Sequence, residues 1–166
     1  MKKLFMLGAI MFGLNLLSGS GLEAGLPAPD FTLPDENDTL HTLSDYLGHR
    51  VVVYFYPKDD TPGCTKEACS IRDSFSRFGE NHIVVLGISY DDAPSHRKFK
   101  EKYKIPFHLL TDADKSVSKL YDANGIFFPS RKTFLIDETG KLIKIYDKVD
   151  VTTHAGDVLE AFSEGN

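Results

Sequence analysis

The chain has 166 residues, of which 42% are hydrophobic and 26% charged, and its formal net charge is −5 at pH 7. This length and composition suit one globular domain with a core of its own. The acidic balance excludes a general nucleic-acid binder, because such proteins gain affinity by neutralising phosphates with lysine and arginine.

The first residues are typical of a secretory signal peptide. A short basic segment, residues 1–3, precedes an apolar run over residues 4–17, and small residues follow as far as Ala24. The run is shorter than the about 20 apolar residues that a membrane-spanning helix needs. We therefore expect residues 1–24 to be a cleaved leader and residues 25–166 to be one exported domain, periplasmic in a bacterium. An uncleaved membrane anchor is the alternative.

The sequence after the leader predicts alternating strands and helices. Phe31–Leu33 and Leu40–Thr42 flank a polar turn and predict a small N-terminal hairpin. Two continuous apolar runs, Val51–Tyr56 and Ile83–Ile88, lack the alternation of half-exposed strands, so we expect central strands covered on both faces. Cys64–Phe78 lies between them and has helical periodicity, which predicts a βαβ unit with two parallel strands.

The second half of the chain continues this alternation. We expect a helix over Pro94–Tyr103, a strand over Phe107–Leu110 and a short helix over Ser116–Tyr121. Two further strands, Thr133–Ile136 and Leu142–Tyr146, are joined by a hairpin turn, and a last helix covers Thr153–Phe162. The order β-β-β-α-β-α-β-α-β-β-α predicts an α/β domain with a mixed central sheet between helices.

The segment from Thr61 to Cys69 places both cysteines of the chain at the start of the first predicted helix. Thr61 suits the N-cap, and Pro62 suits the first helical position. Cys64 then lies in the first turn, where unpaired backbone N–H groups and the helix dipole favour a negative charge. A thiol held there ionises more readily and becomes a nucleophile at neutral pH.

The two cysteines face different sides of this predicted helix. Cys64 continues the apolar stripe of Ala68 and Ile71, so its sulfur should face the protein body. Cys69 comes five positions after Cys64, about 140° around the helix and about 7.5 Å along it. A disulfide needs Cα atoms about 4.4–6.8 Å apart, so an intact helix cannot hold this pair bonded. The spacing therefore favours a redox pair over the static disulfide that export would otherwise suggest.

The sequence gives less support to other kinds of redox, metal or hydrolytic site. The C-x₄-C spacing differs from the C-x-x-C of thioredoxin-like dithiols. The six histidines are scattered without paired spacing, so no metal site is expected. The sequence has no glycine-rich phosphate loop and no G-x-S-x-G nucleophile elbow, and no cofactor is expected.

The segment FYPKDDTPGCTKEAC, residues 55–69, closely resembles the active-site segment of peroxiredoxins, above all the branch called bacterioferritin comigratory protein or peroxiredoxin Q. The family pattern of proline, three residues, threonine or serine, two residues and cysteine is met by Pro57, Thr61 and Cys64. Residues 28–33 resemble the family's opening strand, and residues 131–137 resemble its distal arginine and the strand after it. The resemblance implies a thioredoxin-like fold and thiol-dependent reduction of hydrogen peroxide and organic hydroperoxides.

The resemblance also implies a role for each of five residues. Cys64 would be the peroxidatic nucleophile that becomes a sulfenic acid, and Cys69 the resolving cysteine that closes an intramolecular disulfide. Arg131 would favour the thiolate and orient the peroxide. Thr61 would hold the peroxide or the thiolate, and Pro57 would shape the loop and limit the access of water.

Several alternatives stay open from the residues alone. Arg50 is a rival for the cationic role of Arg131, and Thr61 and Pro57 could be only a helix cap and a turn residue. The family implies a thioredoxin- or glutaredoxin-like reductant, and a monomer is the default. Two other functions compete with the peroxidase: a thiol–disulfide oxidoreductase without peroxidase activity, and a non-enzymatic exported binding domain with an inert disulfide.

Overall fold

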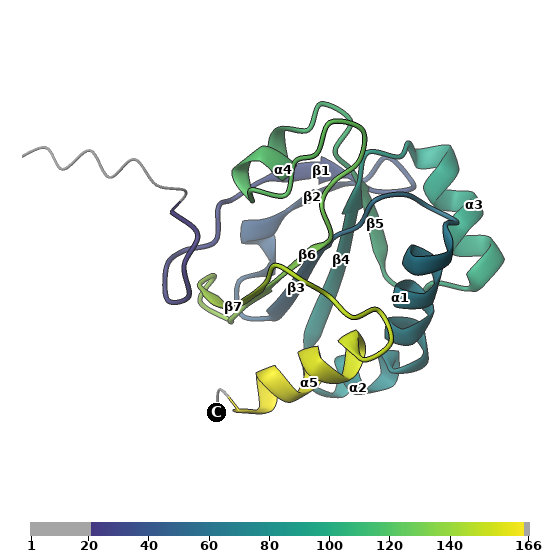
Figure 1. The fold of residues 1–166 in the computed structure, drawn as a ribbon. Helices are drawn as coiled ribbons and strands as arrows, with labels where there is room; N and C mark the ends of the chain where they lie inside the picture. The colour runs from purple at the N-terminus through teal and green to yellow at the C-terminus, as the bar shows by residue number, and fades with distance from the viewer. Residues whose placement is uncertain (1–20, 165–166) are drawn as a thin grey trace, which may run out of the picture.

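A five-stranded sheet in the order β5-β4-β3-β6-β7 forms the centre of the computed structural model, which describes residues 21–164 (Figure 1). Its strands are β3 (Arg50–Phe55), β4 (Ile83–Ser89), β5 (His108–Thr111), β6 (Lys132–Ile136) and β7 (Leu142–Tyr146). β3 is parallel to β4 and β4 to β5, whereas β6 is antiparallel to both β3 and β7. The mixed sheet of the predicted thioredoxin-like α/β fold is confirmed.

Both faces of the sheet are covered, which is why β3 has no polar alternation. Val52 and Tyr54 point into one core, and Val51, Val53 and Phe55 point into the other. Helices cover the first core: α1 (Pro62–Asp73), α2 (Phe75–Glu80), α3 (Ala93–Tyr103) and α5 (His154–Glu164). The second core lies under an N-terminal hairpin, a short 3-10 helix and the short helix α4 (Ser116–Leu120).

The N-terminal hairpin consists of β1 (Thr32–Pro34) and β2 (Leu40–Thr42), which pair antiparallel as predicted. The 3-10 helix Leu43–Tyr46, which the sequence did not predict, follows directly. A bridge between Asp35 and Leu110 joins the hairpin to β5, the edge strand of the main sheet. The hairpin therefore lies against the edge that β5 would otherwise expose.

The single helix predicted over Cys64–Phe78 is wrong at one point, because the helix breaks at Ser74. Ser74 has φ −101° and ψ 6°, outside the helical region, and α2 begins at the next residue. The break lets Phe78 become fully buried in α2, which packs on β4. The segment that carries both cysteines is thus a separate helix, α1.

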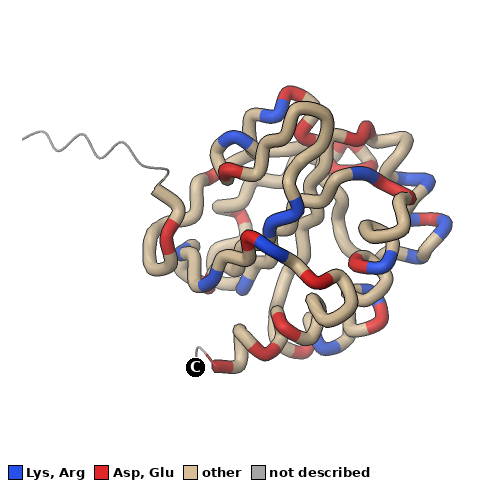
Figure 2. The backbone as a smooth tube through the Cα atoms, viewed as in Figure 1, with Lys and Arg blue, Asp and Glu red and all other residues tan. Residues whose placement is uncertain are grey.

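The predicted leader, residues 1–24, lies almost wholly outside the described residues. Within residues 21–164, no helix is both long and apolar enough to cross a membrane. Acidic and basic residues are interspersed along the described chain, and α3 itself is mainly basic (Figure 2). Two lysines of that helix form ion pairs, Lys100 with Glu36 and Lys102 with Asp60.

Candidate active site

Cys64 lies in the first turn of α1, directly after the loop that follows β3. The Thr61 backbone carbonyl accepts the first helical hydrogen bond from the Thr65 N–H at 2.8 Å, and Pro62 occupies the first helical turn as predicted. The Cys64 side chain is only 2% exposed and belongs to the same core as Ala68 and Ile71. The predicted inward direction of its sulfur is confirmed.

Arg131 lies beside Cys64 because of the antiparallel pairing of β6 with β3. Lys132 pairs with Phe55, so the residue before Lys132 lies near the loop that leads into α1. Arg131 Nη2 donates a hydrogen bond to Cys64 Sγ at 3.2 Å. Arg50, the rival cation, lies at the opposite end of β3 and donates to Glu138 Oε1 at 2.8 Å. The structure therefore places Arg131, and not Arg50, at the sulfur.

Glu67 completes this group, and the sequence reasoning missed it. It is fully buried in α1, one helical turn after Cys64, and its Oε2 accepts a short hydrogen bond from Arg131 Nη1. Arg131 thus bridges the sulfur and the carboxylate with its two terminal nitrogens. An acidic residue three positions after Cys64, on the face of an apolar stripe, was the signal that could have revealed it.

Burial sets the charges in this group. Burial raises the pKa of Glu67 to about 7, although the charge and hydrogen bond of Arg131 lower it. Burial lowers the pKa of Arg131, but Glu67 and Cys64 outweigh this effect and raise it, so the guanidinium stays charged. His154 Nε2 lies 3.8 Å from Glu67 Oε1, and burial lowers its pKa to about 4, so this imidazole is neutral.

Glu67 should make the stability of the fold depend on pH. Folding raises the pKa of Glu67 from 4.5 to about 7. The contribution of Glu67 to the free energy of unfolding is therefore fully present below about pH 4.5 and is lost as the pH rises through 7. The loss approaches about 3 kcal/mol by pH 8. We expect Glu67→Gln to remove this dependence, measured as the difference between wild-type and variant unfolding free energies in denaturant from pH 4.5 to 8. Glu101→Gln, on the exposed face of α3, is the control, and an equal change for both variants would contradict the prediction.

Thr61 occupies the N-cap position, but its side chain does not cap the helix, and this part of the prediction is wrong. Its hydroxyl instead donates a hydrogen bond to the Lys58 carbonyl oxygen at 2.9 Å, within the loop before α1. The hydroxyl proton is therefore engaged by the loop, while the oxygen lone pairs stay able to accept a hydrogen bond.

Buried polar contacts hold the loop from Pro57 to Thr61 in place. Asp59 is 6% exposed, and its carboxylate accepts hydrogen bonds from the Tyr56 hydroxyl at 2.6 Å and the Ser95 hydroxyl at 2.8 Å. The same carboxylate lies 2.8 Å from Nδ1 of the fully buried His96. Half-buried Pro57 lies directly between Tyr56 and this anchored segment. Asp59 and His96 come from distant segments, and no spacing in the sequence pairs them.

Cys69 lies on the other side of α1, as predicted. It is half-buried beside Arg72, in a shallow depression that Lys66 and Val151 also line. Both cysteines are free thiols in one unbroken helix. A bond between them therefore requires α1 to open, and the break after Asp73 separates α1 from α2.

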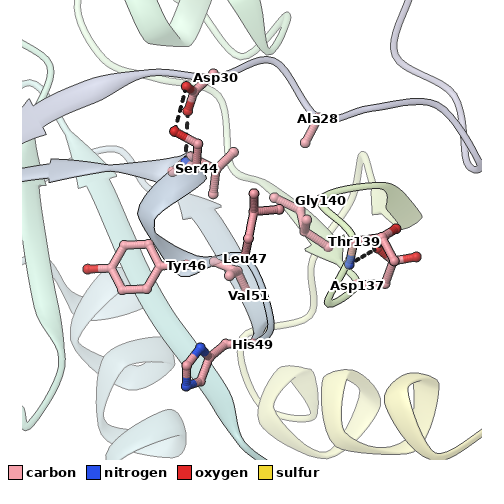
Figure 3. Close-up of a pocket in the computed structure, with 12 residues that line it drawn as sticks. Ala28, Asp30, Ser44, Tyr46, Leu47, His49, Val51, Asp137, Thr139 and Gly140 are labelled. Atoms are coloured by element: carbon pink, nitrogen blue, oxygen red, sulfur yellow. Dashed lines mark hydrogen bonds between the residues drawn. The ribbon is translucent and has the colours of Figure 1, made fainter.

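A separate cavity of about 160 Å³ lies away from Cys64 (Figure 3). It is bounded by Leu43 and Tyr46 of the 3-10 helix and by Gly140 of the β6–β7 turn. Val51 and Ile136 line its floor, and these two residues pair at the end of β3 remote from Cys64. The cavity lining contains no cysteine or arginine, so it is not part of the Cys64 site.

A thioredoxin-like fold with a buried thiol in the first turn of a helix, in contact with an arginine, defines a cysteine-based redox enzyme. The model of the AhpC/TSA family matches residues 24–145. The chain is 42% identical to peroxiredoxin Bcp of Bacillus subtilis over 154 residues, which cover 86% of this chain and 96% of that protein.

Solved structures agree with the sequence comparisons. PrxQ of Xylella fastidiosa, as a cysteine-to-serine mutant, superposes with a TM-score of 0.83 at 31% identity, covering 89% of this chain and 99% of that chain. The bacterioferritin comigratory protein of Xanthomonas campestris, studied for its alkyl peroxide reduction, superposes with a TM-score of 0.80 at 32% identity, covering 86% and 99%. The chain belongs to the AhpC/TSA family and, within it, to the Bcp/PrxQ branch of the peroxiredoxins.

It is accordingly a thiol peroxidase of the Bcp/PrxQ type. The predicted family, fold and peroxidase activity are confirmed. The alternative of a thiol–disulfide oxidoreductase without peroxidase activity, and that of a binding domain with an inert disulfide, are set aside.

Proposed function

We propose that Cys64 is the peroxidatic residue of this enzyme and that Arg131 activates it. The contact of 3.2 Å between Arg131 Nη2 and Cys64 Sγ is the observation that carries this assignment. A permanent cation at that distance favours the thiolate, and the N–H groups of the first turn of α1 act in the same direction. The anchored loop from Pro57 to Thr61 supplies the rest of the site, and the Thr61 oxygen is able to accept a hydrogen bond from the peroxide.

The reaction has two thiol steps. The Cys64 thiolate attacks one oxygen of R–O–O–H, the O–O bond breaks, and the departing RO⁻ takes up a proton to leave as ROH. Cys64 is thereby oxidised to the sulfenic acid, and the Arg131 guanidinium faces the charge that develops on the departing oxygen. The Cys69 thiol then attacks the sulfenic sulfur, which forms the Cys64–Cys69 disulfide and releases water.

A dithiol reductant of the thioredoxin or glutaredoxin type completes the cycle in this proposal. It would attack through a mixed disulfide, form its own disulfide and return Cys64 and Cys69 as thiols. The half-buried position of Cys69, in a depression on the outer side of α1, supports Cys69 as the sulfur that the reductant reaches first. One copy of the chain contains every residue of the scheme, which supports function as a monomer.

Organic hydroperoxides are proposed as substrates alongside hydrogen peroxide. Ile126, Phe127 and Phe128 are 81%, 78% and 49% exposed, and Lys58 Nζ of the active-site loop lies 6.0 Å from the centre of the Phe128 ring. These side chains offer an apolar surface beside the loop for the organic part of such a substrate. Stopped-flow oxidation of the reduced protein by hydrogen peroxide and by cumene hydroperoxide tests the assignment. A reaction no faster than that of an ordinary free thiol would refute it.

The resolving step predicts local opening of α1. The segment from Pro62 to Ser74 should exchange its amide hydrogens faster in the disulfide form than in the reduced form, whereas β3 should exchange equally in both. The reason is that a bonded pair cannot fit the helix that holds both cysteines in the reduced protein. Hydrogen exchange with mass spectrometry measures the difference, and equal protection of α1 in the two forms would contradict it.

Export to an oxidising compartment is also a proposal. It rests on the basic start, the apolar run and the small residues of residues 1–24, and the family match begins at residue 24. The intact mass of the protein purified from its host tests it, because a chain that keeps residues 1–24 would exclude cleavage.

A further inference from the structure

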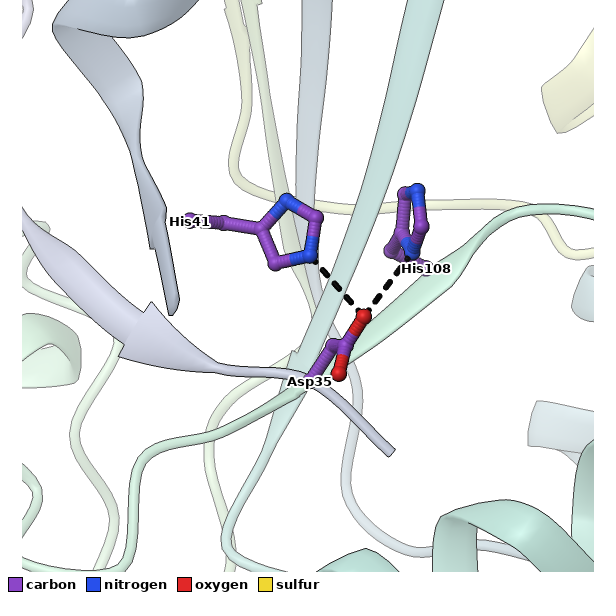
Figure 4. Close-up of side chains that lie close together, drawn as sticks. All are labelled: Asp35, His41 and His108. Carbon is purple, nitrogen blue, oxygen red and sulfur yellow. Dashed lines mark hydrogen bonds and ion pairs between the residues drawn. The ribbon is translucent and has the colours of Figure 1, made fainter. Parts of the chain in front are cut away.

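Two histidines and an aspartate from three separate segments meet at the junction of the hairpin and the main sheet (Figure 4). Asp35 follows β1, His41 lies in β2, and His108 begins β5. Asp35 Oδ2 is 2.9 Å from His41 Nε2 and 3.3 Å from His108 Nδ1. One ligand atom from each of the three residues lies within 4.8 Å of the other two.

The surroundings orient these atoms toward one another. The backbone N–H groups of Asn37 and Thr39 donate to Asp35 Oδ1 at 2.7 and 3.0 Å, which leaves Oδ2 turned toward the two imidazoles. His41 Nδ1 lies 2.5 Å from the Tyr46 hydroxyl, so the second nitrogen of this ring is already engaged. A hydroxyl can donate to or accept from Nδ1, and His41 can therefore present an unprotonated Nε2 without losing its partner.

The group is sheltered from solvent on the side of Asp35 and His41. The Asp35 and His41 side chains are only 3% and 11% exposed. His108 Nδ1 is itself buried and makes no hydrogen bond within residues 21–164, although Asp35 Oδ2 lies 3.3 Å away. A buried ring nitrogen without a hydrogen bond requires an explanation.

We propose that Asp35, His41 and His108 form a binding site for Zn²⁺. Two imidazole nitrogens and one carboxylate oxygen are a ligand set that zinc uses in proteins, with bonds of about 2.0–2.2 Å. Tetrahedral bonds of that length place ligand atoms about 3.4 Å apart. The distances of 2.9 and 3.3 Å about Asp35 Oδ2 need to open by only about 0.1–0.5 Å.

The site lies near the surface. The His108 side chain is 45% exposed although its Nδ1 is buried, which gives an ion a path of entry, and a water molecule would complete the coordination. Lys100, a cation on α3, forms an ion pair with Glu36. Bound zinc would join the hairpin to edge strand β5 through side chains, in addition to the Asp35–Leu110 bridge. Zinc has no redox chemistry of its own, so it would not react with the peroxide substrate.

Cobalt binding tests the site spectroscopically, provided that the two thiols are first removed as competing ligands. The Cys64→Ser/Cys69→Ser protein should bind Co²⁺ with the visible absorption bands of a low-coordinate nitrogen–oxygen site, and Zn²⁺ should displace them at one equivalent. His108→Gln in the same background should weaken binding by at least about 100-fold, because one of three protein ligands is lost. Tyr46→Phe should weaken it by about tenfold, as expected for a residue that orients a ligand.

His49→Gln is the matched control, because His49 is an exposed histidine outside the group. This variant should bind Co²⁺ as the parent does. His108 is half exposed, so its replacement leaves the hairpin and the core intact, and circular dichroism checks this. Absence of Co²⁺ bands in the cysteine-free protein, or binding unchanged by His108→Gln, would overturn the proposal.

Discussion

Replacing Cys64 by serine is expected to reduce peroxide consumption at least about 10³-fold, as removal of a catalytic nucleophile commonly does. A serine hydroxyl at this position cannot be oxidised by peroxide, and the other cysteine, Cys69, lies on the other side of α1. Steady-state turnover with a thioredoxin-type reductant measures the loss. Thiol titration after exposure to peroxide should show that Cys69 remains reduced in this variant.

Cys69→Ser is the matched variant, and it should separate the two thiol steps. Its Cys64 should still react with the first equivalent of peroxide at the wild-type rate, because Cys69 lies on the opposite side of α1 and outside the Arg131 contact. The product should be a sulfenic acid that is stable long enough for mass spectrometry and is over-oxidised by further peroxide. Slow first oxidation in Cys69→Ser, or full turnover in Cys64→Ser, would reverse the assignment of the two cysteines.

Local signals in the sequence were sufficient for the strands and for the position of Cys64. β3 and β4 are continuous apolar runs because both faces of the sheet are covered. The stripe that Cys64 shares with Ala68 predicts the direction of its sulfur, because helical periodicity is a property of neighbouring residues. The break at Ser74 escaped prediction, since the apolar spacing runs on to Phe78 across it.

Contacts between distant segments could not be derived in this way. Arg131 was favoured over Arg50 only through the family resemblance, because the choice depends on the register of β6 against β3. The burial of Glu67 depends on the same register. The hydroxyl of Thr61 turns to the loop because a carbonyl oxygen is available there, and N-cap preference alone cannot reveal that competition.

Arg131→Met is expected to slow the oxidation of Cys64 by peroxide about 10²–10³-fold, the usual loss when one group that stabilises developing charge is removed. The guanidinium touches the sulfur through Nη2 and Glu67 through Nη1. Lysine carries a single ammonium group and cannot reproduce this bridge, so Arg131→Lys should recover only part of the rate. Stopped-flow measurement of the second-order rate constant at pH 7 gives both values.

The fold should survive this substitution because Glu67 can become neutral. Arg131 lowers the pKa of Glu67, which is about 7 in its presence, so removal of the arginine raises that pKa further and leaves a protonated carboxyl group. Arg50→Met is the control, since it removes the same charge at the far end of β3, where Arg50 pairs with Glu138. The control should react with peroxide at the wild-type rate. If the two methionine variants are slowed equally, net charge rather than the contact at Cys64 drives the reaction, and the role given to Arg131 fails.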